Sequence, residues 1–199
     1  VGGGNGMISY EFKGGTGTAS RQLNIGGKLY HLGVLVQSNF GARKDLSILG
    51  VPVGQHLTED TVLDQLHEQE FGSIIVIIAT DLPLIPSQLN RIAKRASLGI
   101  ARTGTIGGHS SGDIFLAFST ANPIKPCDKS KPIMAMEILD DSCLDEVYRA
   151  ARDAVEESII NAMLAGEASY SCRPEGLVVK AIDHEALKFV MEKYDGKVR

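Results

Sequence analysis

Residues 73–80, Ser-Ile-Ile-Val-Ile-Ile-Ala-Thr, restrict the possible folds of this chain more than any other segment. The run has the length of a strand and is rich in β-branched residues, which favour strands over helices. Its apolar residues follow one another without polar alternation, so both faces of the strand are expected to be buried. Strands of this kind lie inside layered folds. We therefore predict an α/β protein whose sheet is covered on both sides.

Four helices are expected, each from a capping residue or a proline in front of an apolar stripe. Their first signals are Thr58, Pro86, Ser142 and Asp183. Gly99 and Gly166 are expected to end the second and the third of them. Further strands are expected at residues 7–12, 32–37, 100–106, 113–119 and 176–182. No repeat or linker interrupts this order, so residues 1–199 are expected to form one catalytic domain.

Composition and charge exclude several classes of protein. Of the 199 residues 43% are apolar, and the net charge is −4 without a basic patch, so no nucleic-acid partner is expected. The longest apolar run, residues 74–79, is far too short to cross a bilayer, and no membrane partner is expected. The five histidines have no ligand spacing, so neither a metal nor a cofactor is predicted.

The cysteines bear on the location of the protein. Cys127, Cys143 and Cys172 are an odd number at wide spacing, which fits neither a disulfide framework nor a zinc site. They are expected to be reduced thiols in a cytoplasmic protein. A periplasmic location stays open, because the sequence starts without a methionine and a leader could precede it.

Residues 107–113, Gly-Gly-His-Ser-Ser-Gly-Asp, are the most informative segment for function. Glycines permit backbone conformations that are closed to other residues, so this stretch can hold a strained geometry. On composition alone, a flexible surface loop is the favoured interpretation. The strongly apolar strand that follows is expected to be central in its sheet and to give a serine at its start rigid support.

Two familiar sites fit this sequence poorly. The stretch around Ser110 matches Gly-x-Ser-x-Gly, but that motif requires a helix after the turn, and a strand is expected here. His109 is too close in sequence to act easily as the base of a triad. Residues 14–18, Gly-Gly-Thr-Gly-Thr, resemble a phosphate-binding loop but lack the following lysine and helix.

An N-terminal nucleophile needs no histidine. In this chemistry a serine hydroxyl attacks the carbonyl in front of it, the amide becomes an ester, and water completes the cut. The amine released at the new chain end has an ordinary pKa of roughly 7.7–8.0. It can therefore be neutral near physiological pH and act as the base for the hydroxyl of its own residue.

Residues 107–122, Gly-Gly-His-Ser-Ser-Gly-Asp-Ile-Phe-Leu-Ala-Phe-Ser-Thr-Ala-Asn, resemble the start of the β-chain in the L-aminopeptidase D-esterase/D-amidase family, which includes the β-peptidyl aminopeptidases. Further similar blocks lie at residues 4–7, 12–21, 34–41, 77–81 and 95–104. The resemblance implies a self-processed hydrolase that releases N-terminal residues from peptides, amides or esters. It also implies a four-layer α/β/β/α sandwich with mixed sheets, similar to that of ornithine acetyltransferase.

The resemblance also implies roles for individual residues. By position, Ser111 is the nucleophile and the cut lies between Ser110 and Ser111, so residues 1–110 belong to the α-chain region and residues 111–199 to the β-chain region. Ser110 is the alternative nucleophile, because the two serines are adjacent. Asn39, at the end of an expected strand, is the candidate that holds the oxyanion, although an asparagine there also suits a turn.

Glu156 is the candidate for a β-chain glutamate that the family places near the nucleophile. It shares a helix face with Arg152 and could instead form a surface ion pair with it. Family members also carry a serine just before this glutamate, and Ala154 and Val155 stand there in this chain. The hydrogen-bond network around the nucleophile is therefore expected to differ from that of the family.

Relatives in this family carry a long part of the α-chain before the motif with which this sequence begins. The resemblance implies that this part supplies sheet strands, and a tyrosine and an acid that line the substrate pocket. We expect it to be present as a separate piece or an associated chain, and we expect a homo-oligomer, a tetramer of processed units.

Two other functions compete with hydrolysis. An ornithine acetyltransferase-like acyl transferase shares the fold and the self-cleavage, but its nucleophile is a threonine, and serines stand at this place here. An inactive homologue would keep the fold and stay uncut. The serine pair favours the hydrolase.

Overall fold

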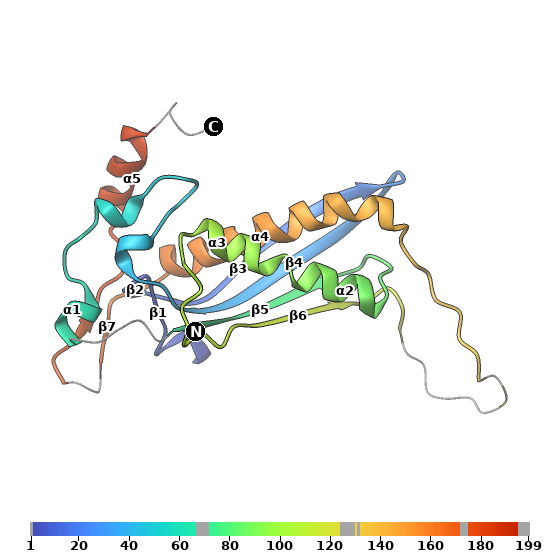
Figure 1. The fold of residues 1–199 in the computed structure, drawn as a ribbon, viewed down its shortest axis with the longest axis horizontal. Coiled ribbons are helices and arrows are strands. Elements are labelled where there is room, and N and C mark those ends of the chain that lie inside the picture. Colours follow the sequence, from blue (N-terminus) through green and yellow to red (C-terminus); the bar gives the residue numbers. More distant parts are fainter. Residues whose placement is uncertain (1, 67–71, 124–129, 131, 172–174, 195–199) are drawn as a thin grey trace.

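A computed structural model describes residues 2–66, 72–123, 130, 132–171 and 175–194 (Figure 1). The main sheet has four strands in the order β3 (Gly15–Ile25), β4 (Lys28–Asn39), β5 (Ser73–Thr80) and β6 (Ile114–Ser119). Strands β3 to β5 pair antiparallel, whereas β6 pairs parallel with β5. The prediction of a mixed α/β fold is confirmed for this part of the chain.

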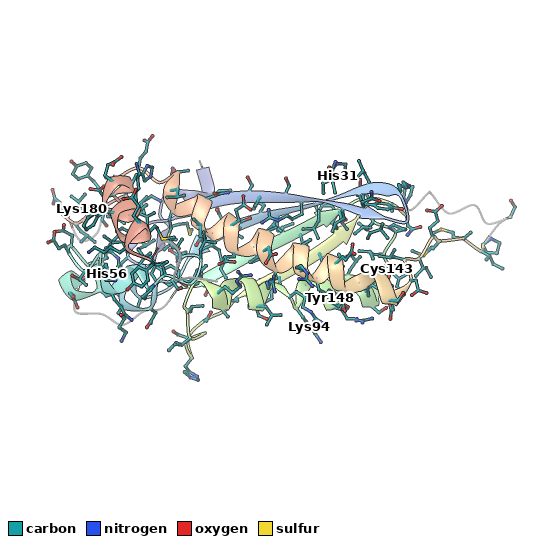
Figure 2. All side chains as sticks on the ribbon, turned by 90° about the horizontal axis from the view of Figure 1, so that it is seen from above. His31, His56, Lys94, Cys143, Tyr148 and Lys180 are labelled. Atoms are coloured by element: carbon teal, nitrogen blue, oxygen red, sulfur yellow. The ribbon has the colours of Figure 1, made fainter. Side chains whose placement is uncertain are left out.

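Three helices cover one face of this sheet (Figures 1 and 2). The long helix α4 (Leu144–Leu164) packs on β3 and β4, α2 (Pro86–Ala93) packs on β6, and α3 (Ala96–Arg102) packs on α4. Gly17 permits the contact between β3 and α4, because a Cβ there would lie 1.9 Å from the backbone oxygen of Ser158. Two layers, one of helices and one of strands, therefore make up the main body.

The expectation that Gly99 ends a helix is wrong, because Gly99 lies inside α3. A Cβ at this position would lie 2.5 Å from the backbone oxygen of Arg152 in α4. The glycine is thus required by the close approach of two helices. The chain bends before it instead, where α2 ends at Ala93 and α3 begins at Ala96.

The expectation that β5 is buried on both faces is wrong for the described residues. Ile74, Val76 and Ile78 point toward the helices and are fully buried, while Ile75 is 44% exposed on the other face. The helices α2 to α4 all lie on the first face, which leaves an outer face open. This outer face carries further exposed apolar side chains at Leu35, Ile114, Leu116 and Phe118.

The structure differs from two further predictions of strands, since one segment is not a strand and the other forms two short strands in place of one. Residues 100–106 continue α3 into a turn, which Thr103 closes by donating a hydrogen bond from Oγ1 to the oxygen of Ile100 (2.7 Å). Residues 7–12 form two short strands, β1 (Ile8–Ser9) and β2 (Phe12–Lys13), around a tight turn. The turn residues Tyr10 and Glu11 have φ angles of 50° and 63°, a conformation that few side chains adopt.

The remaining elements lie beyond the end of the sheet at which β4 ends (Figure 1). They are α1 (Val62–Leu66), β7 (Ser169–Tyr170), β8 (Val178–Val179) and α5 (His184–Lys193). As expected, Asp183 caps α5, because its Oδ1 accepts hydrogen bonds from the backbone nitrogens of Glu185 (2.9 Å) and Ala186 (3.0 Å). The expected strand at residues 176–182 is reduced to β8.

The long helix α4 also starts differently from the expectation. Ser142 does not cap it. The Oδ1 of Asp140 accepts a hydrogen bond from the nitrogen of Ser142 (2.8 Å) and so caps a 3₁₀ turn before the helix, whereas the N-cap residue of α4, Cys143, makes no capping side-chain hydrogen bond. Cys143 is a free thiol, and Cys127 and Cys172 lie outside the described residues. Within the described part of the chain, no helix has both the length and the apolar character that crossing a membrane requires.

Candidate active site

One end of the main sheet brings together residues from three strands. Strand β4 ends at Asn39, and Asn39 pairs with Ser73, the first residue of β5. Because β6 runs parallel to β5, residues 111–113 enter the sheet at this same end. Strand β5 lies between β4 and β6, and neighbouring strands lie about 4.8 Å apart, so the backbones of Asn39 and of this segment are roughly 10 Å apart.

The segment before β6 is fixed to the start of β5 by two hydrogen bonds. The backbone nitrogen of Gly112 donates to Oγ of Ser73 (2.9 Å), and the nitrogen of Ile74 donates to Oδ1 of Asp113 (3.1 Å). The same Oδ1 accepts the hydroxyl of Ser111 (2.6 Å). The expectation that β6 is central is wrong, because β6 is an edge of the described sheet. Rigid support for Ser111 comes from β5 instead.

The amide of Asn39 is oriented by a neighbouring backbone group. Its Oδ1 accepts a hydrogen bond from the nitrogen of Ile8 (2.9 Å). Since an N–H group donates here, the facing atom must be the oxygen, and both N–H bonds of Nδ2 point away from Ile8. An oxyanion donor requires a fixed amide of this kind, and no described residue accepts a hydrogen bond from Nδ2 of Asn39.

Glu156 lies in the helix layer and does not contact Ser111. It is 4% exposed, and its Oε2 forms an ion pair with Nε of Arg102 in α3 (2.9 Å). The suggested surface pair with Arg152 is wrong, because Arg152 pairs with Asp153 (2.7 Å). The other oxygen of Glu156, Oε1, is buried and has no hydrogen-bond partner among the described residues.

Replacing Glu156 by glutamine should change how stability depends on pH. Burial raises the pKa of Glu156 above its usual value, although the positive charge of Arg102 opposes this. A carboxyl with a higher pKa in the folded chain binds protons on folding, so the free energy of unfolding falls as pH rises from about 4.3 through the folded pKa. In urea titrations at several pH values, Glu156→Gln should lack this fall. Parallel curves for the two proteins would contradict the expectation.

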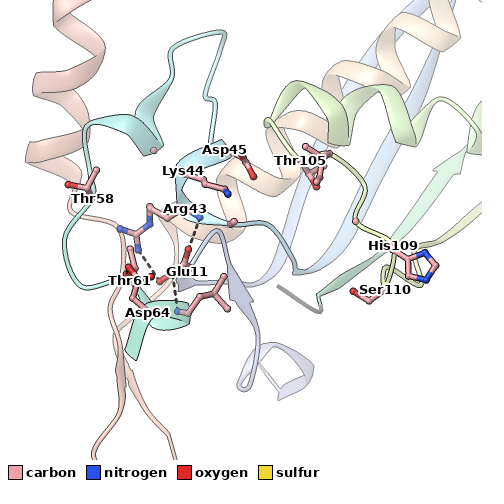
Figure 3. A pocket seen from close by; sticks show the side chains of 15 residues that line it. Glu11, Arg43, Lys44, Asp45, Thr58, Thr61, Asp64, Thr105, His109 and Ser110 are labelled. Carbon is pink, nitrogen blue, oxygen red and sulfur yellow. Dashed lines mark hydrogen bonds between the residues drawn. The ribbon is translucent and has the colours of Figure 1, made fainter. Parts of the chain in front are cut away.

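A cavity of about 790 Å³ opens beside the serine segment (Figure 3). Ser110 and His109 line one side of it, and Ser111 is not among the lining residues. The opposite side is lined by charged and polar residues. These are Glu11, Arg43, Lys44, Asp45, Thr58, Thr61 and Asp64. A peptide-sized molecule therefore has room next to the Ser110–Ser111 bond.

Glu11 and Arg43, which the sequence did not single out, hold that opposite wall together. The Glu11 carboxylate accepts hydrogen bonds from the backbone nitrogens of Arg43 (2.8 Å) and Leu63 (3.0 Å). The buried Arg43 guanidinium stacks on the Phe12 ring at 3.2 Å and donates to the backbone oxygen of Tyr10 (2.8 Å). Burial lowers the pKa of Arg43 to about 10, against the charges of Glu11 and Asp60. No local pattern signals these contacts, because they depend on the left-handed turn at Glu11.

Comparison with known proteins gives this geometry a context. The β-peptidyl aminopeptidase BapA of Sphingosinicella microcystinivorans is 40% identical over 205 residues, which is 98% of this chain and 51% of BapA. The solved L-aminopeptidase D-Ala-esterase/amidase of Ochrobactrum anthropi, described as a variant of the Ntn hydrolase fold, is 52% identical with a TM-score of 0.90. That match covers 98% of this chain and 52% of the other.

A third match is the PH0078 protein of Pyrococcus horikoshii OT3, 46% identical with a TM-score of 0.84 over 96% of this chain and 51% of that protein. The chain thus spans about half the length of the relatives it matches, and its fold is similar to that of the aminopeptidase. The profile of peptidase family S58 matches residues 1–173, on both sides of the serine pair. The chain belongs to peptidase family S58.

Proposed function

We propose that this protein is a self-cleaving aminopeptidase. It cuts its own backbone between Ser110 and Ser111 and then uses Ser111 to release N-terminal residues from peptides, amides or esters. The names of its relatives, a β-peptidyl aminopeptidase and an L-aminopeptidase D-Ala-esterase/amidase, support this class of substrate. The observation that carries the proposal is the placement of Ser111 on a segment anchored to β5, at the sheet end where β4 presents Asn39.

The proposed reaction uses groups of one residue for attack and proton transfer. After the cut, the α-amine of Ser111 takes the proton of its own Oγ, and Oγ attacks the substrate carbonyl. The Nδ2 group of Asn39 donates a hydrogen bond to the oxygen that becomes negative. The amine returns the proton to the leaving group, and water then releases the acyl group by the same steps.

Glu156 has an indirect part in this proposal. Its unpartnered Oε1 is available to a group outside the described residues. A buried carboxylate oxygen without a partner costs free energy, so a donor from another segment is favoured there. We propose that the segment which precedes this chain in longer relatives brings that donor toward the site.

N-terminal sequencing and intact mass measurement of the purified protein test the cut. The expected result is two chains, the second of which begins Ser-Gly-Asp-Ile. A second chain that begins Ser-Ser-Gly-Asp would move the nucleophile to Ser110. An uncut chain that hydrolyses an amide such as L-alanine p-nitroanilide at full rate would overturn the proposal.

We also propose that the open outer face of the sheet is covered by the preceding part of the family's α-chain. The exposed apolar residues gather on β5 and β6, where Ile75 pairs with Ile114 and Ile77 pairs with Leu116. A contiguous apolar face of this kind marks a contact surface. A second sheet and its helices on this face would complete the four-layer sandwich, and the processed units would then assemble as a tetramer.

Leu116→Glu should weaken the binding of the preceding part of the α-chain to the outer face by more than about 100-fold. The reason is that burial of an unpaired carboxylate costs several kcal/mol. Leu116 is 54% exposed on β6 and contributes little to the helix-covered core. Leu98→Glu is the matched control, since Leu98 is 51% exposed on the helix layer. Sedimentation and hydrolysis are measured for both variants. Equal assembly of the two would show that the outer face is not the contact surface.

A further inference from the structure

The proposed base for hydrolysis does not exist before the first cut. Until then the nitrogen of Ser111 is part of a peptide bond, has no basic lone pair, and donates a hydrogen bond to the oxygen of Gly108 (3.0 Å). The self-cleavage step must nevertheless remove a proton from the hydroxyl of Ser111. Another group of the chain is therefore needed for this one step.

Asp113 is the group in contact with that hydroxyl. Its Oδ1 lies 2.6 Å from Oγ of Ser111, within the reach of proton transfer. The nitrogen of Ile74 donates to the same oxygen (3.1 Å), so the carboxylate is held by the second residue of β5 and not only by its own loop. His109, the nearest other base in sequence, lines the cavity and has no hydrogen bond to Ser111.

The anchor at Ser73 keeps the two reacting groups in register. The nitrogen of Gly112, the residue between Ser111 and Asp113, donates to Oγ of Ser73 (2.9 Å). A residue so held cannot rotate away without breaking a bond to β5. Hydrogen bonds from β5 thus hold both the backbone of Gly112 and the carboxylate of Asp113, which keeps the carboxylate close to the Ser111 hydroxyl.

We propose that Asp113 is the general base of the self-cleavage step, an inference that rests on the proposed function. Oγ of Ser111 forms a bond to the carbonyl carbon of Ser110, and its proton passes to Oδ1 of Asp113. The bond from that carbon to the nitrogen of Ser111 then breaks, and the proton moves from Asp113 to this nitrogen. The product is an ester between Ser110 and Ser111 with a free α-amine. Water hydrolyses the ester to the carboxylate of Ser110 and the free hydroxyl of Ser111.

This division of work separates two reactions of one serine. Asp113 serves the single intramolecular cut, and the amine which that cut creates serves every later turnover. A change at Asp113 is therefore expected to affect processing far more than hydrolysis by molecules that are already processed.

The test is the rate of processing of Asp113→Asn, followed in cell-free translation by a radioactive pulse and chase. Asparagine keeps an oxygen that can accept from Ile74 but cannot take the proton, so the cut should slow by roughly 10²–10⁴-fold at an unchanged melting temperature. Asp140→Asn is the matched control. The carboxylate of Asp140 also accepts a hydrogen bond from a residue two positions further along the chain, the backbone nitrogen of Ser142. Asp140 lies before α4 and not in the serine segment. It should be processed as the wild type is.

Two additions sharpen the result. Hydroxylamine cleaves esters, so it should not speed up Asp113→Asn if the ester never forms. Rapid release by hydroxylamine would show that Asp113 acts after the acyl shift and would overturn the inference. Formate should restore part of the rate of Asp113→Ala by supplying a carboxylate in the vacated space, even if the asparagine variant folds poorly.

The outcomes for this inference and for the proposed function are distinct. If Asp113→Asn is cut at the wild-type rate while Ser111→Ala stays whole, Asp113 is not the base, and the proposed function stands. If Ser111→Ala is itself cut, the proposed function is wrong whatever Asp113 does.

Discussion

Ser111→Ala should leave the chain in one piece and lower amide hydrolysis by roughly 10⁶-fold, the loss typical of removing a serine nucleophile. The variant lacks the oxygen that attacks the carbonyl of Ser110, and without the cut no α-amine is released to act as base. The fold should tolerate the change, because among the described residues the Ser111 hydroxyl bonds to Asp113 alone, an exposed residue two positions away. A denaturing gel and the hydrolysis of L-alanine p-nitroanilide measure the two effects.

Ser110→Ala is the matched control for this experiment. It changes the neighbouring serine and keeps the carbonyl that is attacked, so the chain should still be cut and should still turn over substrate. The reverse pattern, with Ser110→Ala uncut and Ser111→Ala active, would assign the chemistry to Ser110.

Asn39→Asp should lower kcat by roughly 10²–10³-fold with little loss of stability. The aspartate keeps an oxygen that accepts from the nitrogen of Ile8, so the local structure is retained. It replaces the donating Nδ2 group by a negatively charged oxygen, which repels the negative oxygen of the transition state. Steady-state kinetics and thermal melting measure the two effects separately.

Asn39→Ala shows how much of any effect is structural. It removes both the donor and the acceptor for Ile8, so it should lose stability by about 1 kcal/mol in addition to activity. Full activity of Asn39→Asp would exclude Asn39 as the oxyanion donor and leave it the turn residue that its sequence position also suits.

Elements with strong local patterns could be predicted from the sequence. The apolar run of β5, the apolar stripe of α4 and the stripe and cap of α5 depend on neighbouring residues only. Strand β3 was missed because its glycine at position 17, which looks like part of a loop, is demanded by contact with α4. Residues 100–106 were mistaken for a strand because apolar residues in a short helix have no distinctive period.

The candidate site was predictable only in part for the same reason. Ser111 and Asn39 stand in recognisable segments, but their common place at one sheet end follows from the antiparallel and parallel pairings of β5. The pairing of Glu156 with Arg102 depends on the crossing of α3 and α4 at Gly99, which no single segment encodes. Asp113 was visible within the serine segment, yet its bonds to Ser111 and Ile74 require the backbone geometry.

The parallel ladder between β5 and β6 has a consequence for what a cut before Ser111 can do. Residues 114–119 stay paired with residues 75–80, and α4 from the same half of the chain stays packed on β3 and β4 from the other. Scission there would therefore yield two polypeptides that these contacts hold together and that a denaturant would separate. The new terminus would stay beside the residues that surrounded it before the cut. Loss of this one peptide bond would therefore leave the sheet and the helix layer intact.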